Sequence, residues 1–134
     1  MKVTLDTEAI KTISLFQSIT GANVKDCSET EDEMYFVVSE GEYGLVVGKD
    51  GSKIKYAENV FKKSIKIFEY SPDLGQFVKN LIPEAQDISI KDNSIRVRIK
   101  PSDRAKVIGK GGSRVKVLAA FVARLHDVED FKVL

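Results

Sequence analysis

The sequence is poor in the residues that build metal sites and disulfides. Among 134 residues there is one cysteine, Cys27, one histidine, His126, and no tryptophan. Cys27 has no partner for an internal disulfide, and one Cys with one His falls short of the four ligands of a structural zinc ion. We therefore expect an inert or buried Cys27 thiol, a capping or surface role for His126, and no bound metal.

Long hydrophobic runs are also missing. No apolar run approaches the length of a membrane-spanning helix or of a signal-peptide core. Hydrophobic residues make up 43% and charged residues 31% of the sequence, a balance that is typical of a globular protein. The expectation is a cytoplasmic protein that has no contact with membranes.

Motifs of nucleotide-dependent and hydrolytic enzymes are absent as well. A P-loop needs Gly-x-x-x-x-Gly-Lys followed by Ser or Thr, and neither Gly-Lys pair has the upstream glycine or the hydroxyl. The run 109–112 lacks the last glycine of the dinucleotide fingerprint. A single histidine offers no plausible catalytic triad. The sequence therefore predicts a protein that is not an enzyme and takes neither a cofactor nor a small-molecule substrate.

Charge is distributed unevenly, although the net charge is only +1. Residues 1–70 hold 9 Lys and Arg against 12 Asp and Glu, whereas residues 71–134 hold 12 against 8. Arginine, whose planar fork pairs well with phosphate, occurs only in the second half: Arg96, Arg98, Arg104, Arg114 and Arg124. The second half is the better candidate for binding a polyanion.

An internal repeat organises the chain. The segment 46–55 recurs at 107–116, an offset of 61 residues. Six of the ten positions are identical and three are conservative exchanges, while Asp50 aligns with Gly111. Such self-similarity over a fixed period is the mark of a duplicated structural unit.

The repeat predicts two domains, residues 1–70 and residues 71–134, joined by almost no linker. The similarity continues weakly downstream, where an exchange of large and small side chains is expected to keep the core volume. The aligned residues there are Val60 and Phe61 against Phe121 and Val122.

The first copy shows alternating helix and strand patterns. A helix with an apolar stripe at every third residue is expected to stop at Gly21, and a short helix at 44–47 precedes the glycine loop. The apolar positions of the helix before Gly21 are Ile10, Ile13, Phe16 and Ile19. Those of the helix after the glycine loop are Ile54, Ala57 and Phe61. Strands are expected at 24–27, where the alternation is poor, and at Ile65 and Ile67. Between them Met34, Phe36 and Val38 alternate with their neighbours, which predicts a strand with one buried face.

The second copy repeats this order. Ser71 is expected to cap a helix that begins at Pro72, and Ser102 to cap a short helix before the second loop. A tight turn at Asp92 and Asn93 pairs Ile90 with Ile95 and Ile88 with Val97, which places Arg96, Arg98 and Lys100 together on the opposite face. A longer helix carries Val115, Leu118, Val122 and Leu125, and a last strand carries Phe131 and Val133.

The glycine loops suit contact with a sugar–phosphate backbone. Glycine has no Cβ, so a backbone can approach closely, and the helix that follows presents unpaired amides at the positive end of its dipole. Lysines and an arginine add charge in and after the loops, and apolar neighbours (46, 47, 54, 107, 108, 115) offer walls for bases. The predicted binding residues are Gly48, Lys49, Gly51, Lys53, Lys55, Gly109, Lys110, Gly111, Gly112, Arg114 and Lys116. Asp50 places a carboxylate where phosphate would pass, which predicts a weaker first site.

These two segments resemble the KH signature Val-Ile-Gly-x-x-Gly-x-x-Ile, at 46–54 and 107–115. The helix-first order within each copy is similar to the type II arrangement, which implies an α+β fold with a three-stranded mixed sheet packed against three helices. KH domains bind about four nucleotides of single-stranded nucleic acid at this loop. The resemblance therefore implies single-stranded RNA as the partner.

Two type II units in tandem resemble the NusA-like family of transcription factors, in the short archaeal form. This resemblance implies a role in transcription termination or antitermination, with RNA polymerase or a transcription complex as a partner. The polymerase-binding and OB-fold modules of the bacterial form have no counterpart in this sequence. Two alternatives stay open: a ribosomal or ribosome-assembly RNA-binding protein, and a protein-interaction scaffold whose KH loops have lost RNA binding.

Overall fold

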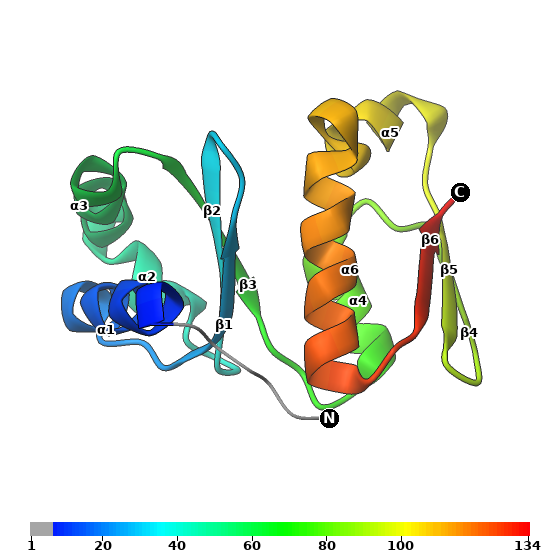
Figure 1. Ribbon diagram of the computed structural model, residues 1–134, viewed down its shortest axis with the longest axis horizontal. Coiled ribbons are helices and arrows are strands. Elements are labelled where there is room, and N and C mark those ends of the chain that lie inside the picture. Colours follow the sequence, from blue (N-terminus) through cyan, green and yellow to red (C-terminus); the bar gives the residue numbers. More distant parts are fainter. Residues whose placement is uncertain (1–6) are drawn as a thin grey trace. The chain divides into compact units, whose positions relative to one another are not determined.

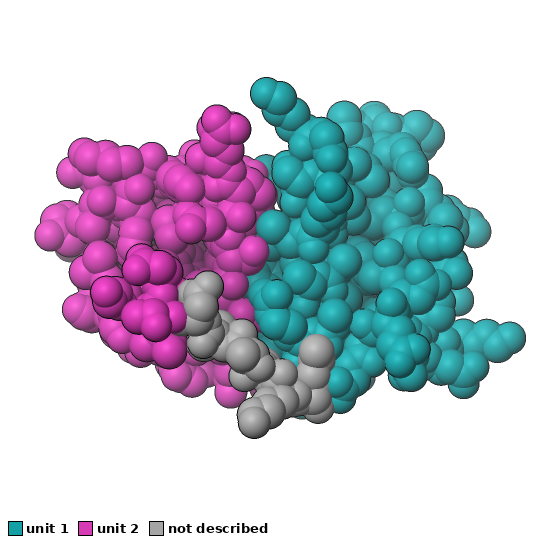
Figure 2. All heavy atoms as spheres, viewed as in Figure 1, with its two compact units in different colours: residues 1–3, 72–134 teal, residues 4–71 magenta. Residues whose placement is uncertain are grey.

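The structure is a computed structural model that describes residues 7–134 (Figure 1). Within this range six α-helices and two three-stranded mixed sheets form an α+β fold. The described residues divide into two compact units, an N-terminal unit of residues 7–71 and a C-terminal unit, Pro72–Leu134 (magenta and teal in Figure 2). Both units follow the order helix, strand, strand, helix, loop, helix, strand, which confirms the predicted α+β class and element order.

The N-terminal unit packs three helices on one face of its sheet (Figure 1). Its elements are α1 (Thr7–Thr20), β1 (Val24–Glu29), β2 (Glu33–Val38), α2 (Tyr43–Val47), the 3-10 turn η1 (Lys49–Gly51), α3 (Ser52–Phe61) and β3 (Ser64–Glu69). The central strand β2 runs antiparallel to β1 and parallel to β3. Gly21 ends α1 as predicted, with φ +77° and its N–H donating to the Gln17 carbonyl at 2.8 Å.

The core of this unit forms around two stacked rings. Phe16 of α1 and Phe36 of β2 are fully buried, with ring centroids 3.8 Å apart and planes inclined by 7°. Cys27 is half-buried and packs against this core, and the inertness of its thiol stays a prediction. The strand β2 differs from the prediction, because Tyr35 and Val37 on its other face are also fully buried. The alternation of β2 therefore marked two buried faces instead of one.

The poor alternation at 24–27 has a structural cause. The pairing of β1 with β2 shifts register between Val24 and Asp26, so the extra residue changes which side chains share a face. Asp26 is fully buried, and its Oδ1 accepts a hydrogen bond from the Cys27 N–H at 2.8 Å. A period-two pattern cannot continue across such a bulge.

Two residues expected in helix cores lie at the surface. Ile10 is 51% exposed because three residues turn a helix by about 300°, so a strict three-residue spacing slips by about 60° per step. Val60 is 39% exposed, whereas both residues of the aligned pair in α6, Phe121 and Val122, are buried. The expected exchange of core volume between the copies is therefore wrong.

The C-terminal unit repeats the architecture of the N-terminal unit. Its elements are α4 (Leu74–Leu81), β4 (Asp87–Lys91), β5 (Ser94–Arg98), α5 (Pro101–Ile108), η2 (Lys110–Gly112), α6 (Ser113–His126) and β6 (Asp130–Val133). The hairpin pairs Ile90 with Ile95 and Ile88 with Val97, as predicted. Phe77, Val97 and Phe121 are fully buried, and His126 ends α6 against the Phe77 ring, with centroids 5.3 Å apart.

The predicted caps of this unit are wrong. Asp73 caps α4, in an extended conformation with its carboxylate accepting the Gln76 N–H at 2.8 Å, so Ser71 and Pro72 stand before the helix. The helix α5 starts at Pro101, which lacks the N–H that a first turn leaves unpaired, so Ser102 lies inside the helix. Lys100 is the cap residue of α5 and no longer belongs to the strand.

Candidate nucleic-acid interface

The two glycine loops have nearly the same backbone conformation. The first glycine has φ 72° and ψ −178° at Gly48, and φ 77° and ψ 173° at Gly109. The third position has φ 55° and ψ 29° at Asp50, and φ 62° and ψ 22° at Gly111. The repeat in sequence is thus a repeat in shape, although one loop has a carboxylate where the other has no side chain.

The first loop glycine is required by both conformation and space. Its φ and ψ lie in a region that is essentially open to glycine alone. A Cβ on Gly109 would lie 2.7 Å from the Arg114 Cβ and 2.9 Å from the Arg114 N, and a Cβ on Gly48 would lie 2.7 Å from the Lys53 Cγ. The loop therefore packs directly on the first turn of the next helix.

The third loop position is less restrictive. Its left-handed conformation is one that Asp and Asn tolerate. A Cβ on Gly111 would meet no atom within 4 Å, and both Asp50 and Gly111 are exposed. Because the backbone accepts Asp50 in this conformation, the difference between the two loops is one of charge.

Each loop leads into a helix whose start has no side-chain cap. The residues before α3 and α6 are Gly51 and Gly112, and neither helix has a side-chain hydrogen bond at its cap. The amides of a helix start carry the positive end of the helix dipole. These helices have 10 and 14 residues, long enough for a well-formed dipole at the loop.

Two lysines in each unit stand exposed beside the loop. Lys49 and Lys110 follow the first glycine. The stems of Lys55 and Lys116 run past the last loop glycine, since their Cε atoms lie 3.7 Å and 4.0 Å from where a Cβ on Gly51 or Gly112 would be. Each of these two stems therefore runs close to the last glycine of its own loop.

Lys53 and Arg114, which were predicted as RNA-binding residues, make contacts within the protein. Their stems lie under the first loop glycine, and their ends turn back onto the protein. Lys53 Nζ donates to the Thr20 carbonyl at 3.3 Å, and Arg114 Nη1 donates to the Lys106 carbonyl at 3.0 Å. Both side chains brace the loop, and a direct contact with RNA stays a prediction.

The second loop has a further brace that the sequence did not reveal. Glu84, after α4, forms a 2.8 Å ion pair with Lys106 of α5. The hydrogen bond from Lys106 lowers the pKa of Glu84 below its ordinary 4.5, and the same bond raises the pKa of Lys106. Arg114 adds to the positive potential at Glu84. These residues are too far apart in sequence for any local pattern to join them.

A groove of about 550 Å³ borders the second loop. It is lined by Pro101, Arg104, Ala105, Ile108, Gly109 and Lys110. Ile108 was predicted as a wall, whereas Val107 is buried beneath it. Arg104 Nη1 donates to the Val133 carbonyl at 3.5 Å, which ties the groove to the end of β6. The spacing of 101, 104, 105 and 108 on one helix face was the signal available for the additional residues.

No three His, Cys, Asp or Glu side chains gather within residues 7–134 as a possible metal site. None of the helices in the described part of the chain combines the length and the apolar character needed to cross a bilayer.

Comparisons with known proteins agree on one family. A KH domain model matches residues 11–84, from within α1 to just beyond α4. A probable transcription termination protein NusA of Methanococcus vannielii is 39% identical and covers 100% of this chain and 81% of its own length. Proteins of the same name in Thermoplasma acidophilum and Methanocaldococcus jannaschii are 33% and 32% identical, covering 98% and 99% of this chain and 96% and 76% of their own lengths.

The solved structure of APE1850 is similar in fold. It aligns with a TM-score of 0.75 and 32% identity over 97% of this chain and 100% of the other. The glycine loops, the element order and these similarities converge, and the chain belongs to the KH-domain family, among its NusA-like archaeal members.

Proposed function

We propose that this protein binds single-stranded RNA through its two glycine loops and acts in transcription termination or antitermination. The observation that carries the proposal is the shared conformation of the loops, which lie 61 residues apart and each lead into an uncapped helix start. A duplicated anion site of this kind, flanked by exposed lysines, suits a repeating polyanion.

The proposed units are two tandem type II KH domains, 1–70 and 71–134. In each, the loop amides and the lysines beside them bind the sugar–phosphate backbone. In the second domain the groove along α5 receives bases on Pro101, Ala105 and Ile108. Lys53 and Arg114 act first by holding the loop against the following helix.

The second domain is proposed as the stronger site. Its loop has Gly111 where the first has the exposed carboxylate of Asp50, and its half of the chain holds an excess of Lys and Arg. A carboxylate repels phosphate, so the first loop gains less from the same backbone geometry.

RNA binding is tested by fluorescence anisotropy with short unpaired RNAs at two salt concentrations. Wild type is compared with a Lys110→Asp, Gly111→Asp variant and with Lys49→Asp, and Lys11→Asp on the exposed surface of α1 serves as the control. We expect the second-loop variant to lose binding and the Lys49 variant to weaken it, with the control unchanged. Failure of wild type to bind RNA at low salt would refute the proposal.

The biological role is tested by affinity capture with the tagged chain. The relatives are named as probable transcription termination proteins, and from them we propose RNA polymerase or a transcription complex as the partner. Recovery of polymerase subunits is the expected result. Recovery of ribosomal particles in their place would contradict it in favour of a ribosomal role.

A further inference from the structure

The C-terminal sheet has one face turned toward α4 and α6 and one face on the side away from them (Figure 1). We call this side the outer face. Strand register groups its side chains into rows across the sheet, because directly paired residues share a face. The rows are Lys91, Ser94 and Asp130, then Ser89, Arg96 and Lys132, then Asp87 and Arg98. These rows hold four cations and two carboxylates, so the face is positive overall.

The other copy of the fold has the opposite chemistry at these positions. Arg96 and Arg98 lie 61 residues after Tyr35 and Val37, the same offset as between the loops. Tyr35 and Val37 are fully buried, whereas Arg98 is exposed and Arg96 half-buried. The fold itself therefore does not require arginine at these positions. Exposure explains why they are polar, but not why both are arginine.

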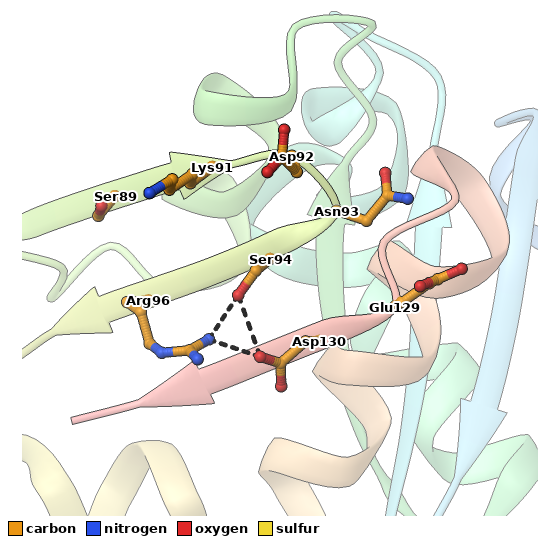
Figure 3. A pocket seen from close by; sticks show the side chains of 8 residues that line it. All are labelled: Ser89, Lys91, Asp92, Asn93, Ser94, Arg96, Glu129 and Asp130. Atoms are coloured by element: carbon orange, nitrogen blue, oxygen red, sulfur yellow. Dashed lines mark hydrogen bonds and ion pairs between the residues drawn. The ribbon is translucent and has the colours of Figure 1, made fainter.

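Arg96 is held in place on this face (Figure 3). Its Nη1 lies 2.8 Å from Asp130 Oδ2 and 2.7 Å from Ser94 Oγ, and Ser94 Oγ lies 3.0 Å from the same carboxylate oxygen. The hydrogen bond from Arg96 lowers the pKa of Asp130 most, and the hydrogen bond from Ser94 lowers it further. The pair neutralises one of the two carboxylates and fixes the Nη1 end of the guanidinium.

Three acidic side chains, Asp92, Glu129 and Asp130, lie at the hairpin-turn end of the face, whereas Asp87 lies at the other end, paired across the strands with Arg98. A hollow of about 560 Å³ surrounds the hairpin turn, where Asp92 and Glu129 join Asp130 (Figure 3). Arg98 and Lys132 lie further along the strands, and neither forms an ion pair with a described residue. An anion is therefore best received in the middle of the face, where the row of Ser89, Arg96 and Lys132 contains no carboxylate and Arg98 follows on the same strand.

We infer that the outer face is a second contact surface for the sugar–phosphate backbone of the RNA strand bound at the second loop. This inference rests on the proposed RNA binding. Arg98 and Lys132 contact phosphates, and Arg96 donates from a fixed position. The RNA reaches the outer face by passing around β6, which is an edge strand of the sheet. The end of β6 is joined to the groove by the hydrogen bond from Arg104 to the Val133 carbonyl. Arginines two residues apart on a strand, about 7 Å, suit successive phosphates of an extended chain.

The test compares RNAs of two lengths at two salt concentrations. KH loops bind about four nucleotides each, so an RNA of about 8 nucleotides fills the loops and one of about 20 can extend beyond them. The test variant is Arg98→Glu with Lys132→Glu. The control variant, Lys11→Glu with Lys62→Glu, makes the same charge change at exposed positions of the N-terminal unit.

For the long RNA we expect the test variant to bind at least about tenfold more weakly than the control variant. Its salt slope should fall by about 0.7 for each phosphate that it no longer binds. The short RNA should bind both variants equally, which also shows that the test variant is folded. If both variants lose the same affinity for the long RNA, or neither loses any, the inference is overturned. Binding of the short RNA in that case leaves the proposed function intact.

Two further outcomes are informative. If wild type binds neither RNA, the proposed function fails and the inference fails with it. If the test variant binds both RNAs like the control but no longer captures a protein partner, the face is a protein contact and the inference is overturned.

Discussion

Exchanging the third residue of the two loops tests charge at constant backbone shape. Asp50→Gly removes the carboxylate from the first loop, and Gly111→Asp places one in the second. Because both positions have the same left-handed conformation and Asp50 already occupies one of them, neither change should disturb the loop. A Cβ on Gly111 meets no atom within 4 Å, so the new side chain has room.

The expected change in stability is small. A side chain in the left-handed region destabilises the folded state by about 1–2 kcal/mol relative to glycine. Glycine, however, loses more conformational entropy on folding, which costs it about 0.5–1 kcal/mol relative to a residue with a side chain. The two terms oppose each other, so each variant should unfold within about 1 kcal/mol of wild type. Any larger change in RNA affinity then reports the charge.

The expected change in affinity is larger. A carboxylate about 5 Å from a phosphate is repelled by about 1 kcal/mol at the dielectric constant of water and about 3 kcal/mol at an effective value near 20. Gly111→Asp should therefore weaken RNA binding by a factor of about 5 to 150, and Asp50→Gly should strengthen binding at the first loop within the same range. Both effects should shrink as salt rises.

The assay is fluorescence anisotropy with short unpaired RNA, and Asp50→Asn serves as the matched control. Asparagine keeps the shape and tolerates the left-handed conformation, so it should reproduce the effect of Asp50→Gly. If Gly111→Asp leaves the affinity unchanged at low salt, phosphate does not pass this loop position and the electrostatic reasoning is wrong. Tighter binding by Asp50→Gly but not by Asp50→Asn would point to backbone flexibility instead.

Three further predictions concern stability. Gly109→Ala should lower the free energy of unfolding by about 2–3 kcal/mol, because the methyl group meets the next helix and the conformation excludes alanine. Phe16→Ala should lower it by about 3–5 kcal/mol because a fully buried ring is removed. The pKa of Glu84 is lowered by Lys106, so its stabilising effect is present above pH 4.5 and lost as the pH falls through the folded-state pKa. Glu84→Gln should remove that part of the acid dependence.

Chemical denaturation measures all three. Gly112→Ala is the control for Gly109→Ala, because a Cβ there lies 4.0 Å from the nearest atom and its conformation is the milder left-handed one; equal destabilisation would show that the close approach is unimportant. Tyr56→Ala, at a side chain that is 60% exposed, controls for Phe16→Ala and should change stability by less than about 0.5 kcal/mol. An unchanged acid limb in Glu84→Gln would show that the ion pair is not linked to folding.

Sequence patterns predicted the features that depend on near neighbours. The element order, the stop at Gly21 and the pairing of Ile90 with Ile95 follow from glycine conformation, turn length and side-chain alternation over a few residues. The shared loop shape was implied by six identities in ten positions. The prediction failed at the start of α4, where Ser71 was expected to be the cap and Asp73, in an extended conformation, is the residue that caps the helix.

Contacts between distant residues were decided by the tertiary structure. Lys53 and Arg114 looked like free charges, but packing places their stems under Gly48 and Gly109 and turns their ends onto backbone carbonyls. The pairing of Glu84 with Lys106 joins two elements that no periodicity relates. The same alternation produced two buried faces in β2 and one exposed face in β5, because burial depends on what packs against a sheet, and a strand's own sequence does not contain that information.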